Sequence, residues 1–192
     1  ASVSIGQGDC VSIRSAFVSN FLLRPNKTLY RLFRPSPGII RFFVHPQTWF
    51  LGKLLSPFGV RTENTHFGDV PTVTFTPKKN VRPKTIFVFF HGGGYCIGSS
   101  RTTHRIGLAN LSKTTSCIIH SVDYRLAPKH PYPAALDDAM QAWKAIVANH
   151  SDSQIILSGD SAGGGLSLAL MMRLRDEGFR LPDAAVLFSP WT

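Results

Sequence analysis

Residues 154–170 read QIILSGDSAGGGLSLAL, an apolar run, a glycine-rich turn and a second apolar run. The first run, up to Leu157, has the composition and length of a buried strand. The second, continued to residue 174, predicts a helix, because its apolar residues recur on one helical face: Leu166, Ala169, Leu170 and Leu174. Ser161 therefore lies in a Gly159-x-Ser161-x-Gly163 pattern between a strand and a helix, the context in which this short pattern indicates a nucleophile.

A serine at such a junction is held on a tight turn, and its hydroxyl is expected to project above the sheet. The positive end of the following helix and the N–H of Ala162 would face the point where an oxyanion forms during acyl transfer. Ser161 is therefore the candidate nucleophile, with Asp160 and Gly163 as supporting residues. The alternative is a glycine-rich turn in which Ser161 only caps the helix.

A second glycine-rich loop, HGGG at residues 91–94, follows the apolar run TIFVFF at residues 85–90. That run predicts a strand buried on both faces of a parallel sheet. Acyl transfer needs N–H donors close to the substrate, and residues without a side chain let the backbone approach. We therefore expect Gly92 and Gly93 to donate to the oxyanion together with Ala162.

The other two residues of this loop are expected to support it. His91 orders the loop rather than catalysing, because the catalytic histidine follows the serine in this order of motifs, and Gly94 completes the turn. A rival interpretation is a dinucleotide-binding loop, Gly92-x-Gly94-x-x-x-Gly98, with Asp123 on the ribose. Its glycine spacing is wrong by one residue and the acid lies too far along the chain, so we reject it. A phosphate-binding P-loop is excluded because no Gly-Lys-Ser/Thr occurs.

Strand and helix patterns alternate along this part of the chain. Strand patterns cover residues 72–76, 85–90, 117–122, 154–157 and 184–188, and helical patterns cover 103–113, a segment opened by Pro133, and the segment after Ser161. Such alternation predicts an α/β fold with a mostly parallel, doubly wound sheet.

The segment that precedes the predicted sheet shows helical patterns in place of strand patterns. Residues 11–23 and 39–55 predict amphipathic helices, the second interrupted at His45-Pro46. We therefore divide the chain into N-terminal helices over residues 1–58 and an α/β domain over residues 59–192.

The net charge of +10 is concentrated in the N-terminal segment. Residues 1–84 carry 12 Lys and Arg against three acids, whereas residues 85–192 carry nine against eight. Basic residues alternate there with aromatic ones, as in YRLFR at residues 30–34, a pattern that could suit an anionic membrane surface or a nucleic acid. We favour a helical cover whose basic side faces water, because no nucleic-acid-binding motif accompanies it.

The cysteine count and the hydropathy limit the classes of protein to which this sequence can belong. Cys10, Cys96 and Cys117 are too few and too scattered for a disulfide framework or a zinc site, which favours a reducing compartment and no metal. No run reaches the roughly 18 apolar residues of a membrane span, and no export signal opens the sequence. We therefore expect a soluble, cytoplasmic protein.

Three runs together closely resemble the hormone-sensitive lipase family of α/β-hydrolases: HGGGY at residues 91–95, DYRLAPKHPYPAA at 123–135 and GDSAGG at 159–164. The resemblance covers about residues 85–191 and implies a carboxylesterase that forms an acyl-serine, with the same oxyanion donors and no metal or cofactor. It also implies that residues 1–58 belong to a cap over the acyl pocket and that residues 59–192 begin the catalytic domain. Lys129 stands where members of the family more often have an acid. By its own chemistry, the proline-rich run 123–133 is a rigid scaffold.

The sequence has no histidine after Ser161. All seven histidines precede it, at positions 45, 66, 91, 104, 120, 130 and 150. A serine hydroxyl is a poor nucleophile until a positioned base takes its proton, and the later acids Asp176, Glu177 and Asp183 fall at a helix end and in a loop. We therefore expect the catalytic acid and histidine beyond Pro190, on a second polypeptide or a missing region that completes the sheet.

Two consequences are expected from this incomplete fold. Alone, the 192 residues would have lost most of their catalytic activity, and the strand ending at Phe188 would form an open, apolar sheet edge. The predicted function is hydrolysis of small hydrophobic carboxylic esters, with no nucleic-acid partner. A non-catalytic small-molecule receptor on the same scaffold and an acyltransferase stay open as alternatives.

Overall fold

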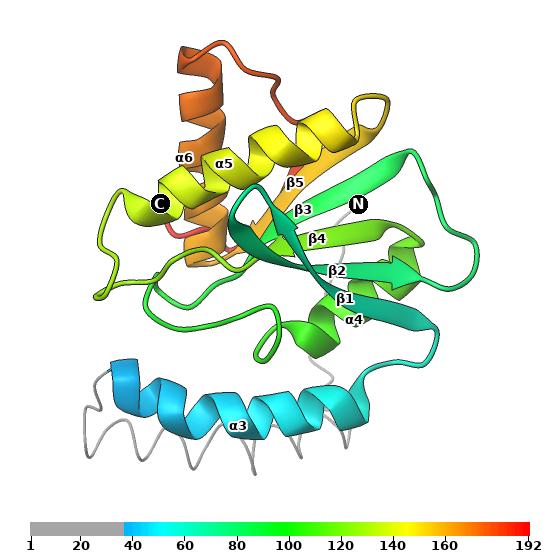
Figure 1. Ribbon diagram of the computed structural model, residues 1–192, viewed down its shortest axis with the longest axis vertical. Coiled ribbons are helices and arrows are strands. Elements are labelled where there is room, and N and C mark those ends of the chain that lie inside the picture. Colours follow the sequence, from blue (N-terminus) through cyan, green and yellow to red (C-terminus); the bar gives the residue numbers. More distant parts are fainter. Residues whose placement is uncertain (1–36) are drawn as a thin grey trace, which may run out of the picture. The chain divides into compact units, whose positions relative to one another are not determined.

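The structure is a computed structural model that describes residues 37–192 (Figure 1). The helix predicted over residues 11–23 lies outside this range, as do the first 36 residues of the predicted cap segment. The described part begins with α3 (Pro37–Leu55), which runs through Pro46. The predicted interruption at His45-Pro46 is therefore wrong: a proline removes one interior hydrogen bond, and this helix continues past it.

The described strands form one six-stranded sheet in the order β1-β2-β4-β3-β5-β6. Their bounds are β1 (Val60–Phe67), β2 (Val70–Pro77), β3 (Thr85–Phe90), β4 (Ile118–Val122), β5 (Gln154–Asp160) and β6 (Ala184–Phe188). The neighbours β4, β3, β5 and β6 run parallel, whereas β1 and β2 are antiparallel at one edge. The predicted, mostly parallel sheet is confirmed.

Helices cover both faces of this sheet. They are α4 (Arg105–Thr115), α5 (Ala134–Asn149) and α6 (Ala162–Asp176). α5 and α6 lie on one face and α4 on the other (Figure 1). The larger core, under α5 and α6, contains Trp143 and Leu170, and the smaller one, under α4, contains Leu108. This two-sided burial of apolar surface makes the sheet doubly wound, as predicted.

The parallel register brings the two glycine-rich motifs together. β3 and β5 are adjacent and parallel, and Phe90 pairs with Gly159, so residues 91–94 and the turn at Ser161 both follow the carboxyl ends of neighbouring strands. The carboxyl ends of parallel strands are where such folds hold their ligands.

At the edge formed by β6, apolar side chains face solvent. Val186 is 42% exposed and Phe188 is 49% exposed, which confirms the predicted open, apolar edge.

Between residues 37 and 192, no helix combines the length and the apolar character needed to cross a membrane. The cytoplasmic location and the domain boundary at residue 58 stay predictions.

Candidate active site

Ser161 lies on a strained turn between β5 and α6. Its backbone angles are φ 50° and ψ −118°, a region that residues with side chains rarely adopt and that the surrounding structure must hold in place. The Ser161 N–H donates to the Phe188 carbonyl (2.9 Å), and the Ser161 carbonyl accepts from the N–H groups of Trp191 (2.8 Å) and Gly165 (3.1 Å). The last residue of β6, the chain that follows it and the first turn of α6 therefore hold this conformation.

The Ser161 side chain faces solvent. Although Ser161 occupies the N-cap position of α6, its hydroxyl makes no capping hydrogen bond. The alternative of an ordinary capping serine is therefore wrong, because the strained backbone turns the hydroxyl away from the helix N–H groups. The result is an exposed hydroxyl at the positive end of a helix.

Gly163 lets α6 start directly against β3. A Cβ at this position would collide with the carbonyl oxygens of Phe90 and His91. Only a residue without a side chain allows this approach, so the glycine fixes the distance between the serine turn and the loop that follows β3.

In that loop, both backbone polar groups of Gly92 are held by hydrogen bonds. Its N–H donates to Asp160 Oδ1 (2.8 Å), and its carbonyl accepts a hydrogen bond from His91 Nδ1 (2.9 Å). Gly92 is buried, and a Cβ there would collide with Asp160 Oδ2. Its N–H is therefore already engaged, which argues against the predicted role of Gly92 as an oxyanion donor.

The next two glycines have the freedom that Gly92 lacks. The Gly93 carbonyl accepts from the N–H groups of Cys96 (3.1 Å) and Ile97 (3.0 Å), so the loop folds back at this point. Within residues 37–192, neither the Gly93 nor the Gly94 N–H donates a hydrogen bond. Gly93 is partly exposed and Gly94 is exposed. The donor role of Gly93 stays a prediction, and the N–H of Gly94, a residue expected only to support the loop, is not engaged by another described residue as that of Gly92 is.

His91 lies inside the protein beneath this loop. Its ring stacks on Tyr124 (centroids 4.5 Å apart, planes 12° apart), and the Tyr124 hydroxyl donates to the His91 carbonyl (2.6 Å). Burial lowers the pKa of His91 below its ordinary value, although the hydrogen bond to the Gly92 carbonyl and the charge of Asp123 oppose this. A buried, neutral imidazole that donates to Gly92 supports the loop-ordering role predicted for it.

Asp160 has a second partner that sequence reasoning missed. His104 Nε2 lies 3.2 Å from Asp160 Oδ1 and 3.3 Å from Oδ2. Burial by itself would raise the pKa of Asp160, but the hydrogen bond and charge of His104 and the N–H of Gly92 outweigh it and lower the pKa. Asp160 is thus an ionised, acceptor-only carboxylate. Nothing in the sequence pattern links two residues 56 positions apart.

The proline-rich run 123–133 forms a rigid frame beside the loop. Asp123 accepts from the Ser100 N–H (2.7 Å), and Arg125 donates to Asp138 from both its backbone N–H (2.7 Å) and Nε (2.9 Å). These bonds support the scaffold interpretation. Lys129 is exposed, and nothing in the structure explains it.

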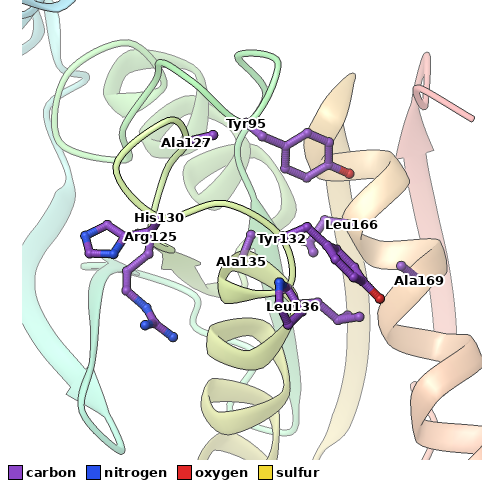
Figure 2. A pocket seen from close by; sticks show the side chains of 10 residues that line it. Tyr95, Arg125, Ala127, His130, Tyr132, Ala135, Leu136, Leu166 and Ala169 are labelled. Atoms are coloured by element: carbon purple, nitrogen blue, oxygen red, sulfur yellow. The ribbon is translucent and has the colours of Figure 1, made fainter. Parts of the chain in front are cut away.

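An apolar cavity of about 320 Å³ lies between this run and α6. Figure 2 shows Tyr95 and Tyr132 reaching toward α6, where Leu166 and Ala169 line the same cavity. Leu166 on α6 is five residues after the N-cap Ser161, so this wall of the cavity lies about one and a half helical turns from the candidate nucleophile.

No base is paired with the candidate nucleophile in the described residues. From residue 37 to residue 192, no histidine nitrogen forms a hydrogen bond with the Ser161 hydroxyl. The site therefore combines a strained serine with the N–H of Ala162, the next residue, and with the glycine-rich loop that leaves the adjacent strand β3. This arrangement can bind and attack a carbonyl group only after another group takes the serine proton.

Comparison with known proteins gives consistent matches. A family model described as alpha/beta hydrolase fold matches residues 87–192. An acetyl-hydrolase of Streptomyces hygroscopicus is 37% identical over 129 residues, covering 65% of this chain and 43% of the relative. An esterase of Acinetobacter venetianus is 40% identical over 102 residues, covering 53% and 33%.

Solved structures agree with these relatives. An esterase from the bacterial hormone-sensitive lipase family superposes with a TM-score of 0.72 at 35% identity, covering 82% of this chain and 52% of that one. A hormone-sensitive lipase from a metagenome library gives 0.68 at 36% identity, covering 76% and 49%. The chain thus spans about half the length of these structures. It belongs to the α/β-hydrolase fold family, in the branch of the hormone-sensitive lipase-like esterases.

Proposed function

We propose that the protein hydrolyses small hydrophobic carboxylic esters through an acyl-serine at Ser161. The observation that carries the proposal is the strained turn that exposes the Ser161 hydroxyl without a capping partner. Strain of this kind is kept where it serves a function. Relatives named as esterase, carboxylesterase and acetyl-hydrolase support the same reaction class.

The chemistry follows from the groups around the turn. Ser161 Oγ attacks the ester carbonyl carbon while a base takes its proton, and the carbonyl oxygen becomes an oxyanion. The N–H groups of Ala162, Gly93 and Gly94 would donate to this oxyanion, whereas Gly92 holds the loop through Asp160. Collapse of the intermediate releases the alcohol, which takes the proton from the base. Water then attacks the acyl-serine in the same way and releases the acid.

We place the base and its orienting acid outside residues 1–192, in a continuation of the chain or in a second polypeptide. The support is twofold: no described histidine contacts the Ser161 hydroxyl, and the chain spans about half of the solved structures that it matches. Among the strands of residues 37–192, β6 has a neighbour on one side only, and its other side could pair with further strands.

The cavity beside α6 fits the hydrophobic part of such a substrate. Its walls are apolar and its volume, about 320 Å³, is at the lower end for small-molecule sites. Burying a short acyl or alcohol chain there would contribute about 0.8 kcal/mol per methylene group.

The test uses the complete protein, with its base present. A fluorophosphonate probe should label Ser161, and Ser161→Ala should abolish labelling and lower kcat for a short-chain p-nitrophenyl ester by about four to six orders of magnitude. Ser151→Ala, in an exposed turn, is the matched control. Unchanged turnover in Ser161→Ala would contradict the proposal, and ester binding without turnover would favour the receptor alternative.

A further inference from the structure

His104 occupies the start of α4 without capping it. It stands at the N-cap position with φ −102° and ψ −7°, and its side chain makes no capping hydrogen bond. Serine, threonine, asparagine and aspartate are the residues that stabilise this position. The His104 side chain is directed instead at the carboxylate of Asp160 on β5. Local rules of this kind are most often broken at functional sites.

The imidazole of His104 is held in one orientation. Its Nδ1 lies 2.8 Å from the Thr103 hydroxyl, and its ring lies beside those of Phe89 and His91 at centroid distances of 6.2 and 5.6 Å. Only 22% of the side chain is exposed. Because an ionised carboxylate only accepts hydrogen bonds, Nε2 must carry a proton and donate to Asp160.

Asp160 passes this constraint to the glycine loop. His104 Nε2 donates to Asp160 Oδ2, the other carboxylate oxygen, Oδ1, accepts the Gly92 N–H, and His91 holds the Gly92 carbonyl. The Gly92 N–H lies in the His91–Gly92 peptide and the Gly92 carbonyl in the Gly92–Gly93 peptide, so these two side chains fix the peptide planes on both sides of Gly92. The following residues, Gly93 and Gly94, carry the N–H groups without a partner in the described part of the chain. A change in the position of Asp160 would release the His91–Gly92 peptide, which directly precedes the peptides that carry both of these N–H groups, and so would redirect them.

We infer that His104 is a positioning residue for ester hydrolysis, which acts through Asp160 and Gly92 to aim the Gly93 and Gly94 N–H groups at the oxyanion. The inference rests on the proposed function. His104 does not touch the substrate in this arrangement, because Asp160 and Gly92 separate it from the loop glycines. Its effect is therefore on the transition state, where the oxyanion exists, and not on binding of the neutral ester.

A purely structural role makes different predictions. If His104 only tied α4 to the sheet, its loss would lower the melting temperature and the fraction of active protein but leave kcat per active site unchanged. A positioning role lowers kcat per active site and leaves KM unchanged. Titration of Ser161 with a fluorophosphonate counts the active sites, so the two roles separate even in a destabilised variant.

The experiment compares His104→Ala, His104→Gln, Asp160→Ala and the double alanine variant in the complete protein, with a short-chain p-nitrophenyl ester. His104→Ala should lower kcat per active site about 10- to 100-fold, with KM within about twofold. Glutamine places an amide N–H near the position of Nε2, so His104→Gln should recover most of the loss. In the Asp160→Ala background, His104→Ala should have no further effect. His66→Ala, on the exposed side of β1, is the matched control.

Three results would overturn the inference: an unchanged kcat per active site in His104→Ala, a His104→Gln variant as impaired as His104→Ala, or additive effects of His104→Ala and Asp160→Ala. Failure of the unmodified protein to label or turn over would instead overturn the proposed function, and the inference with it. The unmodified protein therefore separates the two failures.

Discussion

Lowering the pH from 7 to 5 is expected to destabilise the protein through one buried histidine, His120 on β4. Its side chain lies between Thr74 Oγ1, 2.9 Å from Nδ1, and His150 Nε2, 3.2 Å from Nε2. The residue is only 5% exposed. Burial, and then the charge of His150, lower the pKa of His120 from 6.5 to about 3.

The sign and size of the effect follow from proton binding. In the unfolded chain, His120 takes up a proton as the pH falls through 6.5, whereas in the folded protein it stays neutral until about pH 3. The unfolded state binds more protons in this window, so the free energy of unfolding falls as the pH falls. Each pH unit below 6.5 costs about 1.4 kcal/mol, which gives about 2 kcal/mol at pH 5.

Urea unfolding at pH 7, 6 and 5 measures this loss directly. His120→Gln removes the titrating group but keeps an amide that can bond to the same neighbours, so it should lose about 2 kcal/mol less than the parent protein between pH 7 and 5. His66→Gln on exposed β1 controls for the substitution and should follow the parent. If the parent and His120→Gln lost stability in parallel, His120 would be taking up its proton in the folded state, and the reasoning would be refuted.

Two further substitutions test the contacts that build the site and the core. Gly163→Ala brings a methyl group against the Phe90 carbonyl, so it should lower the free energy of unfolding by about 1–3 kcal/mol and slow fluorophosphonate labelling of Ser161. Gly107→Ala, at a helical glycine with open space around it, should change neither quantity. A Gly163→Ala protein with unchanged melting and labelling would contradict the packing argument. Trp143→Phe removes the hydrogen bond from Nε1 to the Arg180 carbonyl (2.9 Å) and part of a fully buried ring. It should lower the free energy of unfolding by about 2–3 kcal/mol, and an unchanged urea midpoint would contradict this packing and hydrogen-bond argument.

Strands with a continuous apolar composition were predictable from the sequence alone. TIFVFF at residues 85–90 and AAVLF at 184–188 coincide with β3 and β6. β1 was not predicted, because its residues VRTENTHF are mostly polar and it lies at an edge, where little of a strand must be apolar. The break predicted at Pro46 was wrong because a single proline weakens a helix without ending it in every context.

Within the candidate site, features built by neighbouring residues were predictable, and features that depend on distant contacts were not. The strand-to-helix turn placed Ser161 correctly, because residues next to each other in sequence build that turn. The choice of oxyanion donors among Gly92, Gly93 and Gly94 stays a prediction, and the sequence could not rank them, because identical residues differ only in the direction of their N–H groups. That direction depends on Asp160, which lies 68 residues after Gly92.

The sequence by itself therefore determined the order of strands and helices from β2 onward, the serine turn and the glycine-rich loop, since each depends on residue types within a few positions of one another. Only the tertiary structure decided that β3 lies between β4 and β5, with Phe90 beside Gly159. That strand order brings the loop to the turn, and it brings His104 to Asp160 from the start of α4. The physical reason is that side-chain and peptide orientations across a sheet are set by packing between distant segments, which no local pattern encodes.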